Sequence, residues 1–150
     1  MRRTIAIAGA LGLLLGGFAA ADRGALSGQH SLTATKAGWL NIPADEIAPG
    51  GAKLFSYQDA AGRKLRFLLA RDSRGRVYTV FDACEQCFRF HKGYTVSGHY
   101  LVCGYCGNRY RLSEISKGEA SCVPVALTHR EAGHTVKVSV NDLERGRDLF

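Results

Sequence analysis

The chain has 150 residues, enough for one packed domain, and its composition of 46% hydrophobic and 22% charged residues is that of a globular protein. Disorder over most of the length is therefore excluded. The formal net charge is +7, but the basic residues are scattered and form no aromatic-interleaved basic helix, which argues against nucleic-acid binding.

Residues 1–21 have the pattern of an export signal. Arg2 and Arg3 form a positive start, residues 5–18 are apolar or small, and residues 19–21 supply an A-x-A cleavage site. The apolar run is shorter than the roughly 20 residues of a spanning helix, so the pattern favours a cleaved signal peptide over an N-terminal anchor. The paired arginines leave a twin-arginine route open. We expect a protein of the periplasm, or one associated with the outer face of the inner membrane, where a retained segment would act as a membrane tether.

Residues 22–36 are small and polar and are predicted to be a flexible tether. Residues 37–150 follow as a cysteine-rich metal-binding domain, in which short apolar runs alternate with turn residues. This pattern predicts an all-β fold, a small antiparallel sheet or barrel-like domain. The expected strands are 38–42, 53–57, 64–71, 76–81, 93–96, 99–102, 109–112 and 135–140, with one helical turn at 45–47.

Two CxxC pairs carry the chemistry. Cys84 and Cys87 form the first pair, Cys103 and Cys106 form the second, and fifteen residues separate them. This spacing is typical of four-thiolate metal sites, which hold zinc, a single iron or an iron–sulfur cluster. A disulfide framework is the weaker interpretation, because disulfides within CxxC turns are strained and five cysteines cannot all pair.

Other uses of the cysteines fit less well. Attachment of a c-type haem needs CxxCH, but Phe88 and Gly107 follow the two pairs. A thioredoxin-like exchanger needs its CxxC at the start of a helix in a βαβ unit, and both pairs lie among predicted strands. Cysteine–histidine catalysis with His91 or His99 remains open, although metal binding explains every paired thiol. Three roles stay open for Cys122: it replaces one of the four ligands, adds a fifth ligand, or is a buried free cysteine.

Four stretches of the chain resemble the FtrD-like family of membrane iron–sulfur proteins. They are residues 80–87 (VFDACEQC), 92–94 (KGY), 102–110 (VCGYCGNRY) and 122–124 (CVP). The resemblance covers about residues 40–130. It implies a place in bacterial iron uptake, passing electrons among periplasmic and membrane components that handle ferrous iron. It also implies an iron–sulfur or related redox centre, bound at Cys84, Cys87, Cys103 and Cys106.

The cysteine loops also show a more distant similarity to the cluster-binding loops of Rieske domains. A strand that ends in Asp-Ala-Cys is followed by a hairpin and then by Leu-Val-Cys. Cys87 and Cys106 stand approximately where Rieske centres have histidines, which implies an all-thiolate ligand set and a lower potential. The expected fold is therefore Rieske-like or zinc-ribbon-like.

Together these patterns predict an exported electron carrier rather than an enzyme. The expected cofactor is an iron–sulfur cluster, with zinc as the alternative, and the expected partners are membrane or periplasmic redox and iron-transport proteins. Two further functions stay open, a structural zinc-binding module and a metal-delivery protein. The candidate metal ligands are Cys84, Cys87, Cys103, Cys106 and Cys122.

Overall fold

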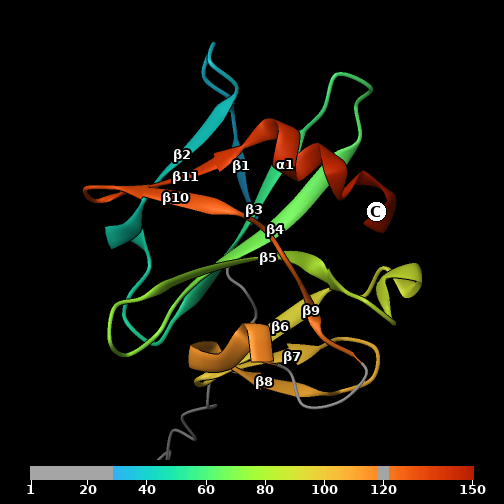
Figure 1. Ribbon diagram of the computed structural model, residues 1–150. Helices are drawn as coiled ribbons and strands as arrows, with labels where there is room; N and C mark the ends of the chain where they lie inside the picture. The colour runs from blue at the N-terminus through green and yellow to red at the C-terminus, as the bar shows by residue number, and fades with distance from the viewer. Residues whose placement is uncertain (1–28, 118–121) are drawn as a thin grey trace, which may run out of the picture.

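The computed structural model describes residues 29–117 and 122–150, and these residues form three small β-sheets with one α-helix (Figure 1). The predicted all-β fold is confirmed. The strands are β1 (His30–Leu32), β2 (Trp39–Pro43), β3 (Ala52–Gln58), β4 (Lys64–Arg71), β5 (Val77–Cys84), β6 (Tyr94–Ser97), β7 (Tyr100–Cys103), β8 (Arg109–Arg111), β9 (Pro124–Ala126), β10 (His129–Ala132) and β11 (Thr135–Ser139). The helix is α1 (Val140–Arg145), and short 3-10 turns are η1 (Ala44–Glu46), η2 (Phe88–Phe90), η3 (Leu112–Lys117) and η4 (Arg147–Leu149).

A five-stranded sheet in the order β1-β3-β4-β5-β9 forms the centre of the molecule. Its strand pairs are antiparallel, except that β1 runs parallel to β3. Phe55, Phe67 and Phe81 lie side by side across β3, β4 and β5, and the first two rings stack with centroids 5.7 Å apart. This aromatic row marks one face of the sheet.

Both faces of the central sheet are covered, which explains why β4 and β5 are buried along most of their length. The face of the aromatic row packs against Leu40, Val136 and Val138 of the antiparallel sheet β10-β11-β2. The opposite face, which includes Leu68 and Val80, packs against the antiparallel sheet β6-β7-β8. Alternate residues of one strand therefore enter two separate apolar cores.

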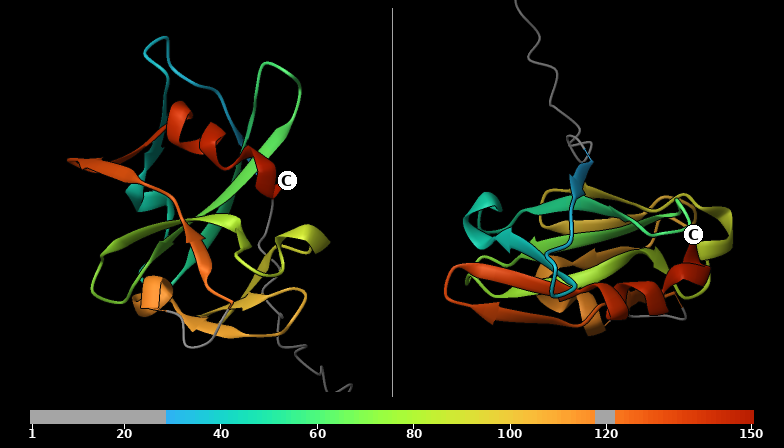
Figure 2. Two further views of the ribbon diagram at one scale, coloured as in Figure 1. Left: turned by 45° about the vertical axis from the view of Figure 1, so that its right-hand side comes forward. Right: turned by 90° about the horizontal axis from the view of Figure 1, so that it is seen from above.

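The sheet β6-β7-β8 lies at one end of the molecule, and β9 starts near it and runs along β5 toward β10 (Figures 1 and 2). Its inner face contributes Tyr94, Leu101, Cys103 and Tyr110 to the second core. Since Cys84 ends β5 and Cys103 ends β7, the packing of this sheet on the central one brings the two CxxC turns together.

The first described strand lies before the predicted domain boundary at residue 37. Residues 30–32 of the predicted tether form β1, which pairs with residues 55–57 of β3. Backbone hydrogen bonds to a sheet edge suit almost any side chain, so the polar sequence gave no sign of this strand. The predicted signal peptide, residues 1–21, lies outside the described residues. Within the part of the chain that is described, no helix is both long enough and apolar enough to cross a membrane.

Candidate metal centre

All five cysteines lie together between the central sheet and the sheet β6-β7-β8. The Sγ atoms of Cys84, Cys87, Cys103 and Cys122 all lie within 4.8 Å of one another. Sγ–Sγ distances are 2.6 Å between Cys84 and Cys122, 4.0 Å between Cys84 and Cys103, and 3.6 Å between Cys87 and Cys122. The Sγ of Cys106 lies 3.7 Å from that of Cys122. Every cysteine that the sequence nominated is therefore at one place.

Burial separates these thiols into an inner and an outer group. Cys84, Cys103 and Cys122 are buried, with at most 4% of their surface exposed. Cys87 is half-buried and Cys106 is exposed. The cluster therefore has a deep sulfur-lined interior and reaches solvent at Cys106.

Cys122 reaches the cluster because β9 pairs with the end of β5. Cys84 is opposite Pro124 in this pairing, and the backbone N–H of Glu85 donates to the carbonyl of Val123 over 3.0 Å. The first CxxC turn is tightened by the N–H of Cys87, which donates to the Sγ of Cys84 over 3.1 Å. The fifth cysteine is thus fixed to the first CxxC pair by backbone pairing.

The second CxxC turn closes on itself through its backbone. The N–H of Cys103 donates to the carbonyl of Asn108 and the N–H of Gly107 donates back to the carbonyl of Cys103, over 2.9 and 3.0 Å. Burial opposes ionisation of the Cys103 thiol, but backbone N–H groups of Cys106 and Tyr105 lower its pKa below the usual value for a thiol. Burial, reinforced by the neighbouring thiols, raises the pKa of Cys87. The backbone of this turn therefore favours the thiolate form of Cys103, which is the form that binds metal.

The Lys92-Gly93-Tyr94 segment joins the two CxxC turns. The N–H of Tyr94 donates to the buried carboxylate of Asp82 over 2.7 Å, and the N–H of Gly104 donates to the carbonyl of Gly93 over 2.8 Å. Arg66 forms the second contact of Asp82, with its Nε 3.4 Å from a carboxylate oxygen. Burial raises the pKa of Asp82, while Arg66 and the Tyr94 N–H oppose the rise. One carboxylate therefore connects β5 to the hairpin that carries the second pair.

Close packing requires glycine at two points of this connection. A Cβ on Gly93, whose φ is +57°, would lie 2.5 Å from both carboxylate oxygens of Asp82. A Cβ on Gly104 would lie 2.7 Å from the carbonyl oxygen of Lys92. Nothing in the sequence indicated the contact between Gly93 and Asp82.

Two tyrosines line the buried side of the cluster. Tyr94 and Tyr110 pack edge to face with centroids 6.2 Å apart, in the same core as Cys84, Cys103 and Cys122. The Tyr110 hydroxyl donates to the carbonyl of Cys122. The Tyr94 hydroxyl is buried and has no hydrogen-bond partner among the described residues. A buried hydroxyl without a partner is unfavourable, so this one fits a site that holds a further acceptor.

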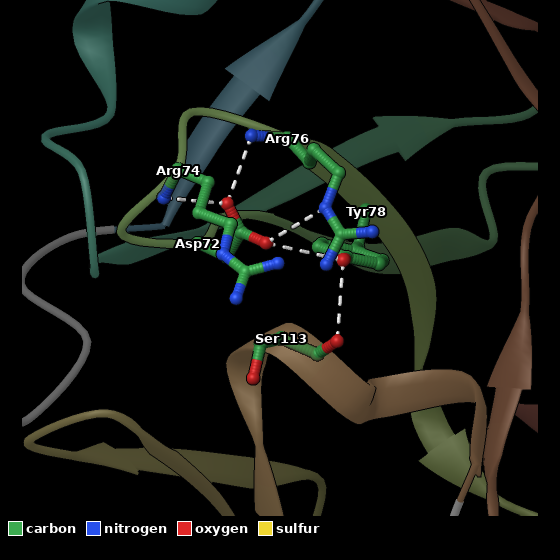
Figure 3. A network of polar contacts seen from close by, with 5 residues as sticks. All are labelled: Asp72, Arg74, Arg76, Tyr78 and Ser113. Atoms are coloured by element: carbon green, nitrogen blue, oxygen red, sulfur yellow. Dashed lines mark hydrogen bonds and ion pairs between the residues drawn. The ribbon is translucent and has the colours of Figure 1, made fainter.

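A polar network fixes the segment that leads toward Cys122 (Figure 3). The buried carboxylate of Asp72 accepts hydrogen bonds from the N–H groups of Arg74 and Arg76, from the Arg76 side chain and from the Tyr78 hydroxyl. The Tyr78 hydroxyl also lies 3.2 Å from the carbonyl of Ser113 in η3, so its single proton is shared between Asp72 and Ser113. Burial opposes ionisation of Asp72, but the donors from Arg76 and Arg74 lower its pKa below the usual value. The β4–β5 turn therefore supports η3.

The two histidines that the sequence left open as catalytic partners of a cysteine lie at the surface. His91 and His99 are exposed, and the group of candidate ligands found among the described residues contains cysteines alone. The residues that sequence reasoning passed over are Asp82 and Gly93. Their signal was present in the Phe-Asp-Ala-Cys and Lys-Gly-Tyr runs, but nothing in the sequence showed that the two runs contact each other.

The donor set is chemically specific. Thiolates suit zinc, iron and iron–sulfur centres, and the hard cations magnesium and calcium prefer oxygen. A small cavity borders Cys84, Cys87 and Cys103, and the side chains of Lys92 and Tyr105 complete its outer wall. The residues present therefore fit a thiolate-bound metal or iron–sulfur group.

Comparison with known proteins identifies the family of the chain. No curated protein matches the chain. The model of one family, described as membrane iron–sulfur containing protein, FtrD-like, matches residues 47–150, which include all five cysteines, Asp82 and Gly93. The chain belongs to the FtrD-like family of membrane iron–sulfur containing proteins.

Proposed function

We propose that this protein is an exported one-electron carrier with a resident iron–sulfur centre held by Cys84, Cys87, Cys103 and Cys122. The observation that carries the proposal is the convergence of these four Sγ atoms within 4.8 Å of one another in a chain of this family. An iron–sulfur centre, when bound, supplies the acceptance and release of single electrons. Cys106 lies at the exposed edge and is assigned outside the inner ligand set.

The chain's own residues keep the centre in place and out of water. Three of the four proposed ligands are buried, so solvent reaches the sulfur atoms only at the side of Cys87 and Cys106. Backbone N–H groups of the second CxxC turn stabilise negative charge on Cys103, as expected of groups that tune a cluster. The buried Tyr94 hydroxyl is available to donate to an acceptor in the site.

We place the carrier in bacterial iron uptake, passing electrons among periplasmic and membrane components. Family membership and the signal-like residues 1–21 support this placement. The proposed location is the periplasm or the outer face of the inner membrane.

A zinc site is the second candidate, and one observation favours it. Four sulfurs bound at about 2.3 Å to a single tetrahedral ion lie about 3.8 Å apart. Three of the Sγ–Sγ distances in the cluster, 3.6, 3.7 and 4.0 Å, are close to that value, whereas the 2.6 Å between Cys84 and Cys122 is shorter. In that case the protein is a structural zinc module or, because Cys106 is exposed, a metal-delivery protein.

Reductive titration separates these functions. The full chain is purified from iron-replete cells without oxygen, and its visible and electron paramagnetic resonance spectra are recorded before and after stoichiometric dithionite. An electron carrier shows sulfur-to-iron absorption that bleaches on reduction and returns on reoxidation. A colourless protein that does not change on addition of dithionite would contradict the proposal.

A further inference from the structure

The most exposed aromatic side chains of the described structure lie directly beside the cysteine cluster. Phe90 and Tyr105 are 42% and 52% exposed and are the large hydrophobic residues that stand out at the described surface. Their rings stack face to face, with centroids 3.7 Å apart and an interplanar angle of 3°. Phe90 follows the first CxxC turn and Tyr105 lies within the second. The two rings, here called the aromatic stack, therefore join both metal-binding turns and remain open to solvent.

The stack is continuous with the interior of the site. Tyr105 borders the small cavity whose wall includes Cys84, Cys87 and Cys103. It also precedes Cys106, the exposed cysteine of the cluster. Tyr105 thus contacts solvent on one side and the surroundings of the sulfur atoms on the other.

The residue that follows Phe90 has an uncommon backbone conformation. Phe90 ends the 3-10 turn η2, and His91 after it has a φ of +49°, the one positive φ of a non-glycine residue among the described residues. The His91 N–H closes the turn on the carbonyl of Phe88 over 2.9 Å. Strained backbone of this kind persists where the surrounding structure requires it, and it is concentrated at functional sites.

The surface around the aromatic stack is positively charged. Residues 84–111 contain four basic residues that are all exposed and one acidic residue, Glu85, which gives a formal charge of +3 for this stretch. None of these five residues takes part in an ion pair within the described structure. Arg89 precedes Phe90, and Lys92 lines the cavity that Tyr105 borders, so these two residues, here called the basic rim, flank the stack. Arg109 and Arg111 lie over the ring of Tyr100 instead.

We infer that the aromatic stack and the basic rim form the docking surface for an acidic electron-transfer protein. This inference rests on the proposed function and adds the class of partner and the place where it binds. An exposed apolar patch with a polar border is the usual anatomy of a protein interface, and aromatic residues are its usual anchors. Unpaired positive charge around the patch attracts an acidic partner and speeds the encounter. The partner's redox group approaches at Tyr105 and Cys106, where the cysteine cluster reaches the described surface.

The test measures electron transfer to two probe proteins of opposite charge. The protein is reduced with dithionite, freed of excess reductant and mixed in a stopped-flow instrument with ferric cytochrome b5, which is acidic, or with ferric cytochrome c, which is basic. In each reaction one electron leaves the reduced centre and converts ferric haem to ferrous haem, with no proton transferred. We expect a larger second-order rate constant for the acidic cytochrome at low salt, and a steep fall in that constant as salt is added.

Three variants locate the surface. Arg89→Glu should lower the low-salt rate constant with cytochrome b5 by roughly three- to tenfold. Lys36→Glu makes the same change in net charge at an exposed residue away from the cysteines, and it should lower the rate constant by less than twofold. Phe90→Ala should lower the rate constant roughly tenfold, because it removes half of the aromatic stack.

The contradicting results are distinct. Equal effects of Arg89→Glu and Lys36→Glu, or no effect of Phe90→Ala, would overturn the docking surface. A second result would also overturn it. If Phe90→Ala and Arg89→Glu no longer bind vesicles that contain anionic phospholipid but keep unchanged rate constants with cytochrome b5, the surface is a membrane contact. Oxidation by benzoquinone, a small uncharged acceptor, checks the centre separately. If benzoquinone does not oxidise the dithionite-treated protein, the proposed electron-carrier function is wrong. If benzoquinone oxidises all variants at the same rate, a changed rate constant with cytochrome b5 reports on docking alone.

Discussion

The Sγ of Cys122 lies 2.6 Å from the Sγ of Cys84, although 38 positions separate the two residues in the chain. This distance is longer than the roughly 2.05 Å of a disulfide bond, and both cysteines are free thiols in the structure. Cys122 is also buried, while Cys106 of the second CxxC pair is exposed. This relationship is the basis for proposing Cys122 as a member of the inner ligand set.

We expect Cys122→Ser to remove most of the bound metal and Cys106→Ser to keep it. Serine is a poor ligand for soft metals, and loss of one inner ligand should weaken metal binding by at least roughly a hundredfold, above the 10–100-fold typical of residues that only support a ligand. Metal per protein, measured by mass spectrometry of purified variants, checks the prediction. Retention of metal in Cys122→Ser with its loss in Cys106→Ser would instead support the two CxxC pairs as the complete ligand set.

Gly93 is predicted to be indispensable to the site, and Gly98 provides a matched control. Both have a φ of +57°, but a Cβ on Gly98 would meet nothing within 4 Å. Gly98→Ala should therefore lower the free energy of unfolding by about 1–2 kcal/mol, the effect of the left-handed backbone alone. Gly93→Ala should lower it by a further 1–3 kcal/mol, because the new methyl group overlaps the Asp82 carboxylate. Urea unfolding measures both, and equal losses would show that the contact with Asp82 is unimportant.

Asp82 should matter for metal binding as well as for stability. Asp82→Ala leaves the buried N–H of Tyr94 without its acceptor, which costs about 1–3 kcal/mol, and it releases the hairpin that carries Cys103. We expect lower metal content together with a lower unfolding free energy. Asp59→Ala is the control, because Asp59 accepts two backbone hydrogen bonds in the β3–β4 turn away from the cysteines. Loss of metal in both variants would mean that general destabilisation, rather than the hairpin connection, empties the site.

The Asp72 network predicts part of the acid sensitivity of the fold. The pKa of Asp72 in the folded protein lies below its ordinary value of 3.8, so its ionised form stabilises the fold above pH 3.8. That contribution is lost as the pH falls from 3.8 through the folded pKa. Asp72→Asn should therefore lower the urea midpoint at pH 7 and flatten its decrease between pH 5 and pH 2.5. An undiminished slope in Asp72→Asn would assign acid sensitivity to other carboxylates.

Tyr78→Phe separates the support of η3 from the charge of Asp72. It removes the hydroxyl that links Asp72 to the carbonyl of Ser113 and should lower the unfolding free energy by about 1–2 kcal/mol. The acid slope should stay as in the unmodified protein, because the Arg76 and Arg74 donors to Asp72 remain. A flattened slope in Tyr78→Phe would contradict this division of roles.

Much of the fold was predictable because its main strands are local patterns. The prediction of a strand at 64–71 coincides with β4, and the predicted hairpin at 93–96 and 99–102 lies one residue before β6 and β7. Turn residues bound these segments on both sides, so their ends were visible in the sequence. Strands β1, β9 and β10 were missed. The first two are short and pair with partners distant in the chain, and β10 (HREA) has no alternation of apolar and polar residues. Proline at the start of β9 also argued against a strand.

The candidate site was predictable to the extent that its ligands repeat a known spacing. The two CxxC pairs identified four cysteines, while the position of Cys122 depends on the pairing of β9 with β5, which no local pattern reveals. The role of Asp82 was hidden for the same reason, because its partner is a backbone N–H twelve residues away in another sheet. The position of Cys122 and the role of Asp82 both depend on contacts between segments distant in the chain, which residue types alone do not reveal.

The content of iron and acid-labile sulfide in the anaerobically purified full chain distinguishes an iron–sulfur centre from a zinc site. We expect iron and sulfide in matching amounts, both lost together in Cys122→Ser. Zinc in stoichiometric amount, with neither iron nor sulfide after growth in iron-replete medium, would contradict this expectation.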